Sequence, residues 1–158
     1  MGIYDGAIRQ LQNDNIRRKG LIIEYKNANI NLNNEIKKLT KEKAEYQDMN
    51  GKISEASSHL ATAQNTIAEA HSAFNIAYSS NNAMQKSHDF SSVNGDIGGI
   101  IGQLYTITGE SNKMITKKEK KIEDDDKAIK HNEKCMEDHN NVIKSNNAQI
   151  AWLSSINN

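Results

Sequence analysis

Large apolar side chains recur every seven residues along most of this chain, and no proline interrupts the pattern. The recurrence is densest at Ile53, Leu60, Ile67 and Phe74, and an alanine follows each of these after three residues, at Ala56, Ala63, Ala70 and Ala77. A second apolar series occupies the C-terminal third, at Ile101, Ile115, Ile122, Ile129, Met136, Ile143 and Ile150. Heptads of this kind predict long α-helices that pack along other helices. The expected fold class is all-α, a long antiparallel helical hairpin or coiled coil.

The composition favours a thin seam between helices over a compact core. Apolar residues make up 36% of the chain, below the roughly 45–50% of typical globular domains. A coiled-coil seam needs only two or three apolar residues per heptad. The 20 basic and 20 acidic residues balance, so no bulk attraction to nucleic acid or to a membrane surface is expected. The basic cluster of Arg17, Arg18 and Lys19 has no interleaved aromatic residues, and we predict no nucleic-acid partner.

We expect one elongated helical domain that spans residues 1–158. The first helix is predicted over residues 3–79 and the second over residues 96–156. The segment 80–95, rich in Ser, Asn and Asp, is predicted to be the loop, because these side chains hydrogen-bond nearby backbone groups and compete with helix.

Two glycines mark places where the helices are expected to kink. Glycine weakens a helix by roughly 1 kcal/mol relative to alanine, and Gly51 and Gly109 lie within the two predicted helices. The heptad phase continues across Gly51, which favours one helix there. The alternative is a shorter arrangement of four helices broken at these two glycines.

The alanine series predicts a partner helix that approaches closely. The expected counterpart is the start of the second helix, at Gly98, Ile101, Gly102 and Leu104. In this arrangement Ala63→Leu would overpack the interface at a cost of about 1–3 kcal/mol. A hairpin covers one side of each helix, so the remaining apolar side chains predict completion by oligomerisation. Trp152, which adjoins the second series, is expected in the core, in self-association or in contact with a partner.

The chain holds no arrangement of residues typical of an enzyme. His131, Cys135 and His139 stand four residues apart, but the outer pair would lie ~12 Å apart along a helix and could not share one ion. No nucleophile elbow, phosphate-binding loop or pair of catalytic carboxylates is present. We therefore predict no enzymatic activity, no metal site and no cofactor.

The apolar runs of the chain are short. Residues 97–104 form the most apolar run, whereas a membrane-spanning helix needs about 20 apolar residues. The first residues lack the basic start and apolar core of a cleaved signal peptide. We expect no membrane span and a protein made in the cytoplasm, which would be secreted, if at all, without a cleaved signal peptide.

The stretch 53–78 followed by a polar segment resembles the first hairpin helix of small α-helical proteins of Gram-positive type VII secretion systems, the WXG-like and LXG-associated group. Val93, Asn94 and Gly95 stand where that group has its Trp-x-Gly turn, with Val93 in place of the tryptophan. The resemblance implies a helix–loop–helix hairpin that dimerises with a helical partner. It also implies service as an adaptor or targeting factor for a secreted LXG-type toxin.

Two functions fit these observations. The first is a non-enzymatic helical interaction protein that pairs with another helical protein, as adaptor, targeting partner or substrate in type VII secretion. The second is a self-assembling structural coiled-coil protein, such as a phage or appendage component. Its partner would then be a second copy of the same chain.

Overall fold

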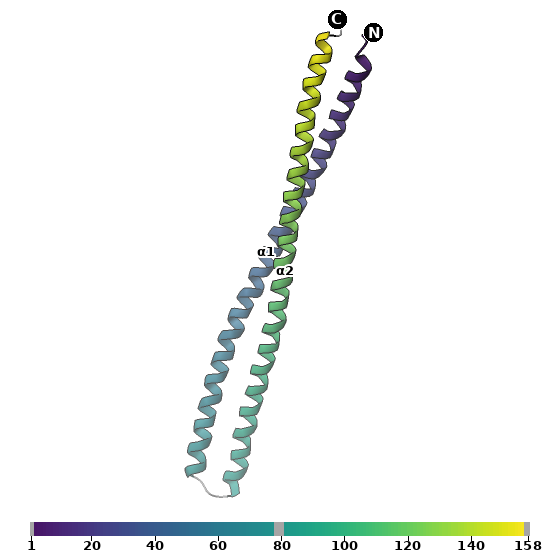
Figure 1. Ribbon diagram of the computed structural model, residues 1–158. Helices are drawn as coiled ribbons and strands as arrows, with labels where there is room; N and C mark the ends of the chain where they lie inside the picture. The colour runs from purple at the N-terminus through teal and green to yellow at the C-terminus, as the bar shows by residue number, and fades with distance from the viewer. Residues whose placement is uncertain (1, 78–80, 157–158) are drawn as a thin grey trace. The chain divides into compact units, whose positions relative to one another are not determined.

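The computed structural model describes residues 2–77 and 81–156, with the backbone alone for residues 81–85. These residues form two helices, α1 from Asp5–Ala77 and α2 from Asn81–Ile156 (Figure 1). The all-α helical hairpin predicted from the heptads is confirmed. Both helices are continuous through the glycines at which kinks were expected, so the arrangement of four shorter helices is wrong.

The chain divides into two compact units, and each contains a stretch of both helices. Unit 1 comprises Met1–Thr40 and Lys120–Asn158, and unit 2 comprises Lys41–Glu119. The helices are antiparallel in each unit. In unit 1, Asn15 of α1 contacts Asn146 of α2, and fourteen residues further along α1, Asn29 contacts Asn132. In unit 2, Lys43 pairs with Glu119 and Asn50 with Asn112.

Two heptad rows of α1 face α2, and they are spaced alternately by four and three residues. The first row contains Leu11, Arg18, Tyr25, Leu32, Leu39, Tyr46, Ile53, Leu60, Ile67 and Phe74, and the second contains Ile8, Asn15, Ile22, Asn29, Ile36, Lys43, Asn50, Ser57, Gln64 and His71. Every member of both rows is buried or half-buried. The apolar series of α2, from Ile101 to Ile150, is buried or half-buried in the same way. Alternation of four and three residues keeps one stripe of a helix against its neighbour.

The alanine row (Ala56, Ala63, Ala70 and Ala77) does not face α2. All four alanines are exposed, and the polar residues that follow each of the first three, Ser57, Gln64 and His71, lie in the seam instead. A step of one residue turns a helix by about 100°, which separates an exposed position from a seam position. The expected packing of the alanine row against the glycines of α2 is therefore wrong.

The glycines near the start of α2 do not mark a close approach of two backbones. A Cβ atom added at Gly98 would meet the Gln64 side-chain nitrogen at 3.3 Å, whereas one added at Gly99 or Gly102 would meet nothing within 4 Å. Gly98 and Ile101 are half-buried, and Gly102 is exposed. In place of the predicted close approach of the helix backbones, only the flexible side chain of Gln64 lies near one of these three glycines, Gly98.

The predicted loop over residues 80–95 is also wrong from residue 81 onward, because α2 begins at Asn81. Val93 and Gly95, the expected turn residues, lie inside α2, and no described glycine has a positive φ. The heptads explain the helix: Phe90 precedes Ile97 by seven residues, and both are half-buried. This apolar seam outweighs the weak helix preference of Ser and Asn. Residue 80 and its two predecessors lie outside the described residues.

Within the described ranges 2–77 and 81–156, no helical stretch is both long enough and apolar enough to cross a membrane.

Candidate interaction surfaces

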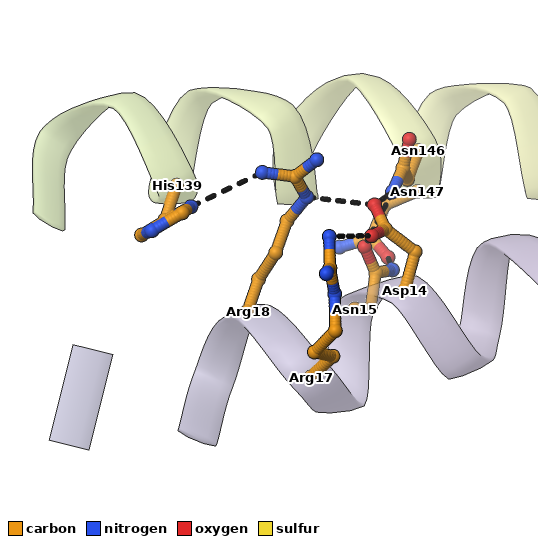
Figure 2. A network of polar contacts seen from close by, with 7 residues as sticks. All are labelled: Asp14, Asn15, Arg17, Arg18, His139, Asn146 and Asn147. Atoms are coloured by element: carbon orange, nitrogen blue, oxygen red, sulfur yellow. Dashed lines mark hydrogen bonds and ion pairs between the residues drawn. The ribbon is translucent and has the colours of Figure 1, made fainter. Parts of the chain in front are cut away.

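A network of asparagine side chains holds the two helices of unit 1 together (Figure 2). The amide nitrogen of Asn146 donates to Asn15 at 2.9 Å and to Asp14 at 3.0 Å. The amide nitrogen of Asn15 donates to Asn147 at 2.9 Å. Asn15 and Asn146 are each only 7% exposed. Because a shift of either helix would leave these buried groups unpaired, the network fixes the register of unit 1.

An arginine extends this network to His139. The Nε of Arg18 donates to Asp14 at 2.6 Å, and a terminal nitrogen of the same guanidinium contacts His139 Nδ1 at 3.1 Å (Figure 2). Arginine only donates, so His139 Nδ1 is the acceptor in this contact. The hydrogen bond from Arg18, then that from Asn146, lowers the pKa of Asp14 below its ordinary value. The carboxylate form of Asp14 is therefore part of the folded network.

The candidate metal ligands are not brought together. His131 and Cys135 approach each other at 3.6 Å along one turn of α2. His139 instead stacks on Tyr25 of α1, with 6.1 Å between ring centroids. Across the described ranges, no cluster of three or more His, Cys, Asp or Glu side chains is arranged to hold a metal ion. A hydrogen bond with Cys135 raises the pKa of Tyr25, so the thiol serves as a seam contact.

The seam of unit 2 combines ion pairs with an aromatic cluster. Lys118 binds Glu42 and lies 5.6 Å from the centre of the Tyr46 ring. Further along, Phe90 of α2 stacks on His71 at 5.7 Å and packs at 5.9 Å from Phe74.

Exposed apolar residues form rows at heptad spacing on both helices. On α1 of unit 1, Ile16, Ile23 and Ile30 are 58–68% exposed, and we call them the outer row. On α2 of unit 2, four exposed residues at seven-residue spacing are Val93, Ile100, Ile107 and Met114, and we call them the bulky row. They are 38–49% exposed. Exposed side chains of this size at regular spacing on one helix face are typical of a surface that another helix covers.

The bulky row and the alanine row flank the same edge of the seam in unit 2. Glu42 occupies the same heptad position as the alanine row, and it binds Lys118 of α2. Val93 of the bulky row lines a groove together with Ile67 of α1. Antiparallel helices place equivalent flanking positions of their heptads on one side of the seam. The two rows therefore form one apolar face, which we call the flank face.

A separate groove in unit 1 contains Trp152. The groove is lined by Ala7, Gln10, Leu11, Asp14, Gln149, Trp152 and Leu153. Trp152 itself is 62% exposed. Trp152, which was predicted as a seam residue, thus lies at the rim of a groove, and its ring is exposed and can contact a partner.

The sequence predicts polar seam residues at Asn15, Asn29 and Lys43 of α1, but the sequence analysis missed the buried polar residues of α2. Ser111 and Asp125 of α2 are each 3% exposed, and neither was predicted to lie between the helices. The available signal was the spacing of Asn15, Asn29 and Lys43, whose series continues to the buried Ser57.

No family model, curated protein or solved structure matches this chain. The class that the fold and the surfaces define is an antiparallel α-helical hairpin with exposed apolar heptad rows.

Proposed function

We propose that this chain is a non-enzymatic interaction protein that binds other helices along its exposed apolar rows. The observation that carries the proposal is the regular seven-residue spacing of large exposed side chains, such as Ile16, Ile23 and Ile30. Isolated exposed apolar residues are common on protein surfaces, but aligned rows are not. If a partner helix buried each such side chain, the apolar area removed from water would contribute about 1–2 kcal/mol per side chain to the free energy of binding.

The test is chemical cross-linking in cells that express a tagged chain, followed by purification and identification of the cross-linked species. We expect complexes that contain at least one further helical chain. A variant with Ile16, Ile23 and Ile30 all changed to Gln, and another with Ile100 and Ile107 changed to Gln, should reduce these complexes. Recovery of the single chain alone, from wild type as well as from both variants, would contradict the proposal.

Service in type VII secretion is the finer form of this proposal. Its support is the resemblance in length and in the pattern of stretch 53–78, together with the helical hairpin. The turn residues of that resemblance, Val93 and Gly95, lie within α2, so they provide no support. Co-expression with an LXG-type toxin tests the idea: a stable complex with the toxin's helical region is expected, and separate elution of the two chains would contradict it.

A self-assembling structural protein is the second candidate, and exposed rows on both units favour it. A chain with apolar faces in two places could bind two neighbours and grow. Light scattering over a concentration series distinguishes this candidate, because it predicts continued growth in mass, whereas an adaptor predicts small complexes of defined size.

A further inference from the structure

The flank face of unit 2 combines two rows of different size. The alanine row of α1 offers methyl groups, and the bulky row of α2 offers Val, Ile and Met side chains. A partner that fits this face must place large side chains over the alanines and small ones over the bulky row. A second copy of the same face, turned by 180° about an axis parallel to the helices, does this at both rows.

The charges that border the flank face support the same partner. On α1, Met49 precedes Ala56 by seven residues and so continues the alanine row. Glu45 and Lys52 precede Met49 and Ala56 by four positions each, so they border the outer side of this row. On α2, Glu110 and Lys117 follow Ile107 and Met114 by three positions and border the other side. Along each border the acidic residue comes first in the sequence and the basic residue second. Because the two helices are antiparallel, the acidic residue of one border lies level with the basic residue of the other.

Contacts within the hairpin show where each of these charged residues lies along the helix axis. Lys43 pairs with Glu119, so two residues further along α1 Glu45 is level with Lys117. Asn50 pairs with Asn112, so Lys52 is level with Glu110. These four side chains point away from the hairpin seam and are exposed. When α1 of one copy lies over α2 of another, Glu45 meets Lys117 and Lys52 meets Glu110, and the two-fold axis repeats both pairs.

We infer that two copies of this chain pair through the flank face of unit 2 and form a four-helix bundle with α1 of each copy over α2 of the other. The inference rests on the function proposed above and names its partner as a second copy. The alanine row and the bulky row each extend over ~30 Å at 1.5 Å per residue, and two helices are ~20 Å wide. The footprint is therefore ~600 Å² per copy and ~1,200 Å² for both, at the lower end of the range for specific interfaces. A two-fold axis perpendicular to the helices would instead stack alanine on alanine and bulky row on bulky row.

The first experiment is size-exclusion chromatography with light scattering on the full chain over a concentration series. Two copies of the 17.7 kDa chain give a dimer of about 35 kDa. Ala63→Glu places a carboxylate from each copy in the apolar interface and should raise the dissociation constant at least ~100-fold. Ile107→Glu, in the other row, should act similarly. The matched control is Ala61→Glu, which is exposed on the opposite edge and should leave the dimer intact.

A mixing experiment tests the charge pairs. Lys52→Glu and Glu110→Lys should each weaken self-association by about 3–10-fold, because each homodimer then carries two repulsive pairs. Equal mixing of the two variants should restore wild-type association, since both pairs become attractive in the mixed dimer. Circular dichroism checks that each variant remains helical.

Three results would overturn the inference. They are a monomeric wild type at all concentrations, a dimer that Ala61→Glu weakens as much as Ala63→Glu does, and a mixture that associates no better than its components. Any of these leaves the proposed function standing if cross-linking in cells still recovers a different helical chain. Only the recovery of no partner in that experiment removes the proposed function as well.

Discussion

Unit 1 and unit 2 pair the same two helices through different side chains. In unit 1 the buried positions include hydrogen-bonded asparagines, such as Asn15 and Asn146. In unit 2 the first row is apolar at Ile53, Leu60 and Ile67, and Ile67 lines a groove with Phe90 of α2. Buried amides tolerate one register, whereas apolar contacts are less directional. The amides of unit 1 are thus suited to fix the register, whereas the seam of unit 2 depends more on apolar burial.

The largest effect is expected from loss of the central amide of unit 1. Asn146→Ala leaves the buried oxygen of Asn15 without its donor and removes one of the donors to Asp14, so it should lower the free energy of unfolding by about 1–3 kcal/mol. Urea denaturation measures the change. Asn141→Ala, at an exposed position of α2, is the matched control and should have little effect. Equal effects of the two substitutions would contradict the network's role.

Replacing both partners tests whether the network provides specificity as well as stability. The double change Asn15→Leu with Asn146→Leu removes both buried amides, and Asn147, which loses its donor, is exposed to water, so unfolding should need as much denaturant as in wild type or more. The register should become less unique, because leucines pack at several levels. Light scattering should then show more than one species, and a single species with unchanged mass would count against the register argument.

In unit 2 the corresponding change is Leu60→Ala, which removes a half-buried apolar side chain from the seam. We expect a loss of about 1–2 kcal/mol, less than for a fully buried leucine. Ile76→Ala is the control in the same unit, since Ile76 is 85% exposed and should be nearly neutral. If the two variants melt alike, the seam of unit 2 does not contribute to stability through apolar burial.

The class of fold could be predicted because a seven-residue apolar period without proline leaves few other structures. For the second seam row of α1, however, the sequence supports two incompatible assignments. The asparagine series from Asn15 through Asn29 and Lys43 leads to Ser57, one residue after Ala56. Apolar character favoured Ala56, yet Ser57 is 7% exposed and Ala56 is exposed. A small polar residue fits a narrow seam as well as alanine does, so hydrophobicity alone could not decide the phase.

The loop was misplaced for a related reason. Ser and Asn prefer turns when they are considered singly, but residues 81–95 are carried by the heptad positions of Phe90 and Asn94, both half-buried. Tertiary contacts along a seam outweigh a weak local preference. The flank face could not be foreseen, because it depends on which edge of the seam the alanine row occupies.

A smaller effect separates two neighbouring glycines of unit 2. Gly99→Ala should stabilise α2 by about 0.5–1 kcal/mol, because alanine is the better helix former and nothing lies within 4 Å of the new methyl group. Gly98→Ala should gain less, since its methyl group meets Gln64 at 3.3 Å and that side chain also donates to the Asn94 carbonyl oxygen. Thermal melts of both variants measure the difference. An equal gain would mean that Gln64 moves aside freely.

The smallest effect concerns acid and the network of unit 1. Hydrogen bonds from Arg18 and Asn146 lower the pKa of Asp14 from 3.8, so its stabilising contribution is present above that value and is lost as the pH falls through the lower pKa of the folded state. The difference in unfolding free energy between wild type and Asp14→Asn should therefore be constant near neutral pH and shrink below about pH 4. Arg18→Gln removes the largest cause of the shift, so in that background the difference should vary less with pH. An identical pH profile in both backgrounds would assign the shift to Asn146, and the bond between the two helices would then matter more than the one within α1.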